Sequence, residues 1–341
     1  MGKITIKEIA ERAGLSVSAV SYVLNNKKGV SEETRQRVWD IIKELDYTPN
    51  VNSRRLVLQR SFNILVCLDD SIFNLDNLFY TEILSAIVSK GEKLGYSVVL
   101  SKSGSDKLGE RVAQNLSQHN ADGIVFLSDV SENVQNTISA HGIPFLVVDS
   151  HNLAPSYPCI VSDTKKAAYT ATKYLIEQGH RKIAYIGMDR IPAFYFNSFT
   201  GYKQALEEYE LPIQVNWIQS GAHDEASAAR CMKRIMSGTN PPTAVFCSAD
   251  IFAVGAMRAA KESGYGIPKD FSFIGMDDII LSRYCDPALT TLRIDKEKMG
   301  SMAVQMLDDI LNGKDPVSPS VVEFDQLIER GTVRKLQIET E

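Results

Sequence analysis

The chain has 341 residues, more than one ordinary domain of about 100–200 residues contains. Hydrophobic residues make up 44% and charged residues 23% of it, which excludes a disordered or fibrous protein. The formal net charge of −5, taken whole, argues against a nucleic-acid-binding protein, because such domains usually carry an excess of Lys and Arg.

The charge is distributed unevenly along the chain. Residues 1–60 contain 11 Lys and Arg side chains against 7 Asp and Glu, a net charge of +4, so the remaining residues carry −9. A small cationic segment joined to a large anionic body indicates a module that binds a polyanion, linked to a second function.

The first 45 residues predict three short helices. Thr5 followed by Glu8 has the spacing of a capping box, which opens a helix that Gly14 ends. Ser16 caps a second helix, and Ser31 starts a third. Two short helices separated by a few residues that include glycine have the spacing of a helix-turn-helix, whose second helix enters the DNA major groove.

The outward residues of the second helix are small or polar enough to approach base edges and phosphates. They are Val17, Ser18, Ser21, Tyr22 and Asn25. The alternative is a small helical module that binds protein, and the cationic excess of this segment argues against it.

The segment 49–60 leaves two interpretations open. Pro49 ends the preceding helix, and Asn50 has the character of a cap for one more short helix that carries Arg54, Arg55 and Leu56. Such a helix is marginal alone, but on DNA the arginines would hold phosphates while the leucine wedges into the minor groove. The alternative is a flexible linker, and physical reasoning on these residues does not decide between the two.

From Phe62 onward, short apolar runs alternate with helical patterns. The runs are NILVCL, YSVVLS, DGIVFL and PFLVVD, followed later by KIAYIG, TAVFCS and FSFIG. Apolar strands that alternate with helices predict parallel sheets covered on both faces, here two doubly wound lobes in tandem. Ligands of such sheets bind at the carboxyl ends of the strands, so we expect a site in a cleft between the lobes.

Two carboxylates, Asp149 and Asp277, each stand at the end of a predicted strand. A carboxylate accepts two hydroxyl hydrogen bonds, which suits a polyol ligand, although either residue is also explained as a helix cap or a loop carboxylate. Asp250, which follows TAVFCSA, is predicted to cap the helix that contains residues 252–260.

Other classes of protein lack their motifs. The N-terminus has no apolar core of a signal peptide and no run of about 18 apolar residues occurs, which predicts a cytoplasmic protein without a membrane span. The five cysteines form no CxxC pair and the five histidines no HxxxH pair, so no disulfide or metal is expected, and Cys67 and Cys247 are predicted in the core. GxSxG, P-loop and dinucleotide glycine motifs are absent, so we expect neither an enzyme nor a cofactor.

Motifs spread over almost the entire chain resemble the lactose-repressor (LacI/GalR) family of bacterial transcription regulators. They are TIKEIAERAGLSVSAVSYVLN, VSEETRQRV, KELDYTPN and RRL, then ADGIVFL, YLIEQGHRKIAYIG, PTAVFC, IPKDFSFIGMDD and PALTTL. The resemblance implies a small all-α helix-turn-helix head and an α/β body whose two lobes look like periplasmic sugar-binding proteins. It also implies that Leu56 and its symmetry mate insert into the centre of the operator.

The resemblance implies domain boundaries as well. The DNA-binding domain is 1–49, the hinge helix and linker are 50–60, and the effector-binding and dimerisation body is 61–341. Three crossovers connect the lobes, which we place near 157–162, 289–294 and 321–327. Lobe one then takes 61–160 plus 291–320, and lobe two takes 161–290 plus 321–341.

The site residues that the resemblance implies fall into two sets. The expected DNA contacts are Thr5, Ser16, Val17, Ser18, Ser21, Tyr22, Asn25, Lys28, Tyr47, Asn50, Arg54, Arg55 and Leu56. The expected effector contacts are Phe79, Tyr80, Asp149, Phe196, Ser198, Ala249 and Asp277. Phe79 and Tyr80 match an aromatic pair near the effector, for which core packing is an equal alternative. Ser198 stands where the family commonly has an arginine that clamps effector hydroxyls, and Ala249 where a lactose-sensing member has asparagine.

Together these features predict a cytoplasmic DNA-binding regulator, a repressor of carbohydrate-use genes that binds a pseudo-palindromic operator as a homodimer. A small-molecule effector, expected to be a sugar or sugar derivative, closes the cleft and changes operator affinity. The alternatives are a regulator that responds to a nucleoside or to a protein corepressor, and a solute-binding protein.

Tyr22 generates a prediction about operator sequence. The family usually has Arg or His at this position, able to read guanine, whereas tyrosine cannot make the bidentate contact. We therefore expect an operator preference that differs at that base pair. Selection of binding sites from a random DNA library checks this, and a preferred sequence identical to the common family operator at that pair would show the prediction to be wrong.

Overall fold

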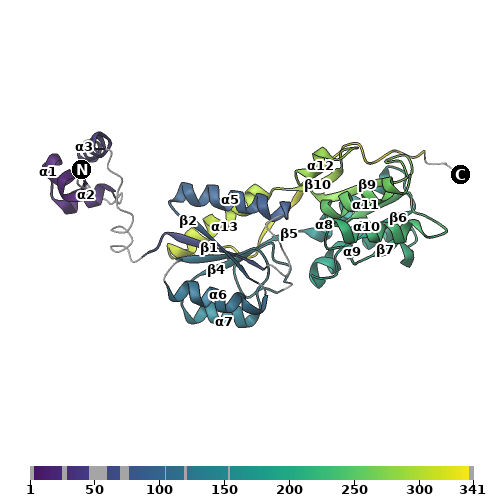
Figure 1. The fold of residues 1–341 in the computed structure, drawn as a ribbon, viewed down its shortest axis with the longest axis horizontal. Coiled ribbons are helices and arrows are strands. Elements are labelled where there is room, and N and C mark those ends of the chain that lie inside the picture. Colours follow the sequence, from purple (N-terminus) through teal and green to yellow (C-terminus); the bar gives the residue numbers. More distant parts are fainter. Residues whose placement is uncertain are drawn as a thin grey trace. The chain divides into compact units, whose positions relative to one another are not determined.

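The computed structural model describes residues 4–24, 29–45, 60–69, 77–103, 105–118, 121–152 and 154–337. The chain divides into two compact units, Met1–Ser61 and Phe62–Glu341, each of which is described by itself (Figure 1). The predicted hinge helix lies almost entirely outside the described residues. No helix within the described ranges has both the length and the apolar character needed to cross a membrane.

The N-terminal unit contains the three predicted helices. They are α1 (Ile6–Ala13), α2 (Val17–Leu24) and α3 (Glu32–Glu44). Thr5 and Glu8 form the predicted capping box, and Gly14 ends α1 in the left-handed conformation, with φ of 61°. Ser16 and Ser31 cap the next two helices through hydrogen bonds from Ala19 N and Thr34 N. Apolar side chains from all three helices form one small buried core: Ile9, Ala10, Ala13, Val20, Val23, Val38 and Ile42.

Lobe one of the body is a six-stranded parallel sheet with the order β11-β5-β4-β3-β1-β2. Its strands are β1 (Asn63–Asp69), β2 (Ser97–Ser103), β3 (Gly123–Phe126), β4 (Phe145–Val148), β5 (Cys159–Ser162) and β11 (Ser320–Val322). Helices α5 (Leu78–Leu94) and α13 (Lys296–Leu311) cover one face, and α6 (Ser105–Ser117) and α7 (Glu132–Ala140) cover the other (Figure 1). Cys67 is buried in this core, as predicted.

Lobe two has the same architecture, with the order β12-β10-β9-β8-β6-β7. Its strands are β6 (Ile183–Ile186), β7 (Ile218–Gln219), β8 (Ala244–Cys247), β9 (Ser272–Asp277), β10 (Thr290–Ile294) and β12 (Phe324–Ile328). Its helices are α8 (Thr164–Glu177), α9 (Pro192–Glu208), η1 (Val215–Trp217), α10 (Glu225–Met236), α11 (Asp250–Glu262) and α12 (Leu281–Tyr284). β12 runs antiparallel to β10 at the sheet edge, a departure from the all-parallel prediction. Cys247 is buried in this core, as predicted.

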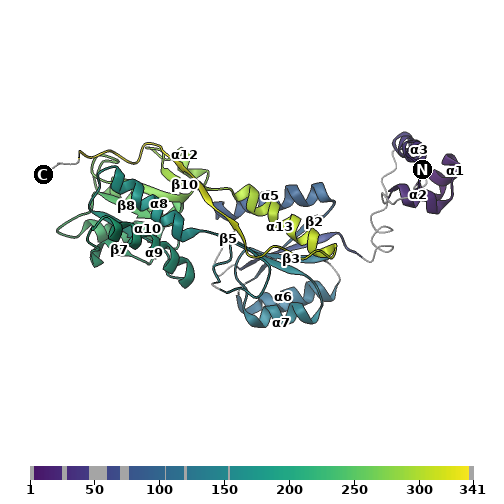
Figure 2. The ribbon, with the colours of Figure 1, turned by 180° about the vertical axis from the view of Figure 1, so that it is seen from behind.

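Three single acidic residues mark the crossovers between the lobes. Asp163 separates β5 from α8, Asp295 separates β10 from α13, and Glu323 separates β11 from β12. Figure 2 shows the chain passing between the two lobes along these connections. The expected lobe boundaries therefore need correction. Residues 291–294 belong to lobe two because β10 pairs with β9. Residues 161–162 and 321–322 belong to lobe one because β5 pairs with β4 and with β11.

The prediction that Asp250 caps its helix is wrong. Ala249 occupies the cap position of α11 and makes no side-chain cap bond, because Asp250 is already the first helical residue. The buried Asp250 carboxylate instead accepts hydrogen bonds from the Ile279 amide at 3.0 Å and from the Ser282 and Thr291 hydroxyls at 2.5 Å each. Burial raises the pKa of Asp250 to about 7, even though these hydrogen bonds favour the ionised form.

Asp250 should make the stability of the body fall with rising pH. In the unfolded chain the pKa of Asp250 is about 3.9, so the folded chain holds this proton more tightly, and that stability is lost as the pH rises through about 7. In Asp250→Asn the dependence should be smaller, since the amide does not ionise; one group contributes at most about 1.4 kcal/mol per pH unit. Urea unfolding between pH 5 and pH 8.5 measures it.

The matched control for that measurement is Asp286→Asn, which removes a fully exposed carboxylate near the same corner of lobe two. It should leave the slope of the wild type unchanged. If Asp250→Asn also leaves the slope unchanged, the raised pKa of Asp250 is contradicted.

Candidate functional site

Asp149 and Asp277 lie at the carboxyl ends of strands in different lobes. Asp149 follows β4 directly and Asp277 is the last residue of β9. Both have positive φ, 59° and 110°, a region that side-chain-bearing residues rarely adopt. Such backbone conformations cost of order 1–3 kcal/mol and gather at functional sites, where the surrounding contacts hold them.

Asp149 is buried and ionised, with three partners. It accepts a hydrogen bond from the Tyr80 hydroxyl at 2.7 Å and one from Ser162 at 3.3 Å, and its Oδ2 lies 3.4 Å from Nε2 of His151. Burial alone would raise the pKa of Asp149, but the pairing with His151 and these hydrogen bonds lower it below its ordinary value. Burial alone would lower the pKa of His151, but the Asp149 carboxylate raises it above its ordinary value.

Asp277 is in the opposite situation. Among the described residues, no hydrogen-bond donor reaches its carboxyl group, although Lys296 donates to its backbone carbonyl. Burial and the neighbouring carboxylate of Asp250 raise the pKa of Asp277 well above its ordinary value, and Asp149 adds to the repulsion. The protonated form of a carboxyl group both donates and accepts hydrogen bonds, and burial favours that form in Asp277.

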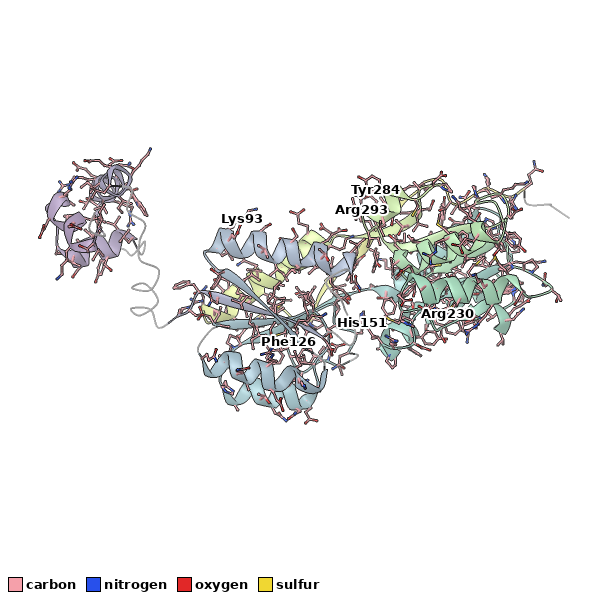
Figure 3. All side chains as sticks on the ribbon, viewed as in Figure 1. Lys93, Phe126, His151, Arg230, Tyr284 and Arg293 are labelled. Carbon is pink, nitrogen blue, oxygen red and sulfur yellow. The ribbon has the colours of Figure 1, made fainter. Side chains whose placement is uncertain are left out.

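Aromatic side chains from both lobes meet near Asp149. The rings of Phe79 and Tyr80 pack edge to face, with centroids 4.9 Å apart, and both contact the core of lobe one. The His151 ring lies 5.1 Å from that of Phe194, on α9 of lobe two. Figure 3 places His151 on the side of lobe one that faces lobe two. Tyr80 therefore has both roles considered for it, core packing and a polar contact in the site.

Three other expected effector residues have no polar contact with the two aspartates. Ser198 is fully buried, and its hydroxyl is 2.7 Å from the Tyr185 hydroxyl and donates to backbone carbonyls of α9. Phe196 is 61% exposed. Ala249 packs at the edge of the lobe-two core. In this conformation Ser198 supports α9 from inside, since its short side chain reaches a partner within the same lobe.

His151 and Lys296 join the site without having been predicted from the sequence. His151 had a signal, because it stands two residues after a strand-end aspartate, where the chain has not yet left the carboxyl edge of the sheet. Lys296 had none, because only the crossover from β10 to α13 brings it to Asp277.

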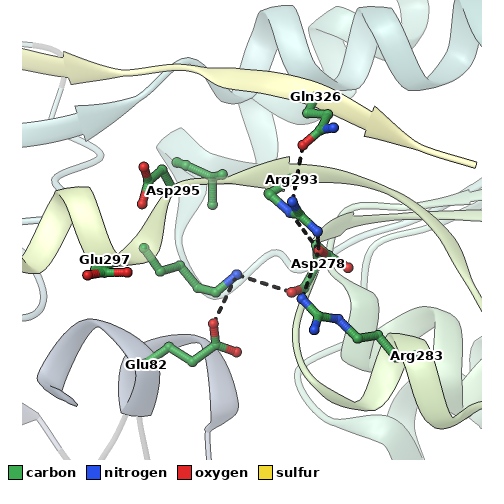
Figure 4. Close-up of a pocket in the computed structure, with 9 residues that line it drawn as sticks. Glu82, Asp278, Arg283, Arg293, Asp295, Glu297 and Gln326 are labelled. Atoms are coloured by element: carbon green, nitrogen blue, oxygen red, sulfur yellow. Dashed lines mark hydrogen bonds and ion pairs between the residues drawn. The ribbon is translucent and has the colours of Figure 1, made fainter. Parts of the chain in front are cut away.

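A cavity of about 370 Å³ lies at the junction of the lobes, beside the turn that contains Asp278 (Figure 4). Its lining is mostly charged: Glu82, Asp278, Arg283, Arg293, Asp295, Lys296 and Glu297, with Ile294 and Gln326. Neither Asp149 nor Asp277 lines it, although Asp278 adjoins Asp277 in the chain. The cavity therefore lies at the crossover segments that join the lobes, and it differs from the ligand cleft expected from the sequence.

In the N-terminal unit, α2 presents the expected DNA-facing residues. Val17, Ser18 and Tyr22 are exposed, and Ser21 is half-buried, on a helix whose Val20 and Val23 are buried. Thr5 and Ser16 are exposed at the N-termini of α1 and α2, positions that favour phosphate binding. The remaining expected contacts lie outside the described residues: Asn25, Lys28, Tyr47, Asn50, Arg54, Arg55 and Leu56.

Comparison with protein families gives two matches. Residues 5–50 match "Bacterial regulatory proteins, lacI family", and residues 172–333 match "Periplasmic binding protein-like domain". The chain is 33% identical over 333 residues to the "HTH-type transcriptional repressor PurR" of Klebsiella pneumoniae (strain 342), covering 96% of each chain. It is 30% identical over 336 residues to the repressor of that name from Mannheimia succiniciproducens, covering 97% of this chain and 99% of the relative.

Solved structures of transcription regulators are also similar to this chain. The lac repressor dimer bound to operator and the anti-inducer ONPF is similar with a TM-score of 0.77 and 26% identity, covering 98% of this chain and 100% of that one. The complex of the transcriptional regulator CelR with cellobiose has a TM-score of 0.73 at 24% identity, covering 97% and 100%. At that identity the second likeness shows the fold alone.

His151→Phe should destabilise the body most at mildly acidic pH. The ring keeps its place against Phe194, but Asp149 loses its positive partner, which should lower the free energy of unfolding by about 1–3 kcal/mol. Because the folded pKa of His151 is raised, its stabilisation is fully present below about pH 6.5 and is lost as the pH rises through the folded pKa. Urea unfolding at pH 5.5 and pH 9 should show the difference from wild type shrinking at the higher pH.

His141→Phe serves as the control, since His141 is exposed at the end of α7. A difference from wild type that is the same at both pH values for His151→Phe would count against the ion pair with Asp149.

Proposed function

The chain belongs to the lacI family of bacterial regulatory proteins, and on that premise we propose that a small molecule bound between its lobes controls its hold on DNA. It is a DNA-binding transcriptional repressor. We propose a regulator without enzymatic activity that acts in the cytoplasm, where its operator lies. The geometry that supports a ligand site is the pair of aspartates, one in each lobe, that stand at strand ends with strained backbones.

The N-terminal unit supports an operator-binding role. It carries a net charge of +4 on an otherwise acidic chain, and α2 presents Val17, Ser18 and Tyr22 on its exposed face. A twofold reader matches a pseudo-palindromic site, and the lac repressor, a structural relative, was solved as a dimer on its operator. We therefore propose a homodimer whose DNA affinity falls with salt, with phosphate contacts from Lys28, Arg54 and Arg55.

For the effector, a nucleoside-like ring is better supported than the free sugar expected from the sequence. Asp149 accepts hydrogen bonds, Asp277 both donates and accepts, and rings from both lobes surround Asp149, a combination that suits a flat heterocycle. The relatives named above as at least 30% identical are PurR repressors. The neighbours solved with cellobiose and ribose are only 24% and 21% identical. We propose that the chain senses a nucleoside.

Ligand and operator act on each other through the lobes. A ligand that binds one arrangement of the lobes better than the other shifts the equilibrium between the two arrangements. The size of the shift is limited to the difference in the ligand's affinity for them. Because the heads are joined to lobe one of each protomer, a change between the lobes alters operator affinity, and by linkage the operator alters ligand affinity equally. 

A thermal-shift screen with adenosine, guanosine, cytidine, uridine, glucose, ribose and lactose tests the ligand class. At least one nucleoside should raise the melting temperature, and the sugars should not. At about 100 times its Kd, such a ligand adds about 2.7 kcal/mol to the free energy of unfolding. Asp149→Asn and Asp277→Ala should each remove the shift, and Asp286→Asn should keep it. A chain that begins at Phe62 should keep the shift and lose operator binding, because the body has its own cores. Shifts with sugars alone would overturn the proposed class.

A further inference from the structure

The turn that follows β9 contains two adjacent aspartates in opposite electrostatic situations. Asp277 and Asp278 both have positive φ, 110° and 50°. The Asp277 carboxyl has no donor among the described residues, whereas Asp278 faces three arginines. Its nearest oxygens lie 2.6 Å from Arg293, 2.5 Å from Arg330 and 3.8 Å from Arg283. Figure 4 shows Arg283 and Arg293 converging on Asp278.

Lys296 holds this turn from the other lobe. It is the first residue of α13, a helix whose buried side chains pack with those of α5 in the core of lobe one. The lysine is 5% exposed, and its Nζ donates to the backbone carbonyls of Asp277 at 2.5 Å and of Asp278 at 3.2 Å. The same Nζ lies 3.4 Å from the carboxylate of Glu82 on α5. One ammonium group thus contacts both lobes.

Charged side chains from both lobes gather at this junction. The cavity of about 370 Å³ opens beside the turn, between Glu82, Lys296, Asp278 and Arg283. Without the ammonium group, the Glu82 carboxylate of lobe one would lose its positive partner and the Asp277 turn would lose its contact with α13, and Glu82 already contributes to the raised pKa of Asp277. The two carbonyls of the strained turn would also lose the donor that fixes their direction.

We propose that Lys296 is a positioning residue that ties the Asp277 turn of lobe two to lobe one. Lys296 sets both the direction of the Asp277 carboxyl group and the separation of the two lobes at their junction. The assignment of Asp277 to ligand binding rests on the proposed function, but the tie itself is a property of the chain without ligand.

The test is Lys296→Met in the full chain, with Lys298→Met as the matched control. Lys298 is exposed on the same turn of α13. Its substitution removes the same charge, but from a side chain outside the contact with the Asp277 turn. The substitutions Glu92→Cys on α5 and Glu262→Cys on α11, both at exposed positions, provide attachment sites for spin labels. The labels report the distance between the lobes. The background carries Cys285→Ser, because the other four cysteines are buried.

Lys296→Met should shift the distance distribution to longer and broader values, and Lys298→Met should reproduce the wild type. Lys296→Arg, which keeps a cation, should restore most of the wild-type distribution. If Lys296→Met does not fold, Glu82→Gln supplies the measurement, since Glu82 is 41% exposed and its loss weakens the tie on the lobe-one side only. Distances in Lys296→Met, or in Glu82→Gln in its place, that equal those of Lys298→Met would overturn the proposal.

The thermal-shift screen separates this proposal from the proposed function. If no nucleoside stabilises the wild type but Lys296→Met still lengthens the distances, the ligand class is wrong and the tie stands. If a nucleoside stabilises the wild type and the distances do not change, the tie is wrong and the ligand class stands.

Discussion

The junction of the two lobes depends on how buried carboxylates are neutralised. Moving an ionised carboxylate out of water is costly unless it gains hydrogen bonds or a positive partner. Asp149 gains His151, and Asp278 gains three arginines. Among the described residues, no hydrogen bond reaches the Asp277 carboxyl group, and burial raises its pKa well above the ordinary value although the nearby Lys296 ammonium lowers it. This carboxyl group is the one that we propose takes a hydrogen-bond partner from a ligand.

The proposed ligand contacts and the proposed tie between the lobes share the same few residues because of the topology. A doubly wound sheet gathers the carboxyl ends of its strands along one edge, and the lobes are joined by crossovers that leave from that edge. The crossover at Asp295 delivers Lys296 to the turn that contains Asp277. A ligand that engages Asp277 therefore acts on a turn already bonded to lobe one, with no intervening chain of contacts.

How much of this was predictable depends on the range of the signal. The seven apolar runs were recognised as strands because apolar residues predominate in each of them. Most of these strands are buried, but β2, at the edge of its sheet, exposes Leu100. β5, β10 and β12 were placed only within crossover segments, because they mix Ser, Thr, Arg or Gln with apolar residues. The Asp250 cap was wrong because its strongest partners, the hydroxyls of Ser282 and Thr291, come from elements 32 and 41 residues away.

Local spacing was sufficient to establish the helical head, the tandem α/β lobes and the family, because caps, apolar periodicity and short motifs act over a few residues. It also placed Asp149 and Asp277 at strand ends. Only the folded chain separated their chemistry, since the charge of a buried carboxyl group depends on neighbours that the crossovers supply. His151 pairs with Asp149 and leaves it ionised, whereas Asp277 meets another carboxylate and a lysine that reaches only its backbone. That difference arises in three dimensions, because desolvation and charge pairing act through space.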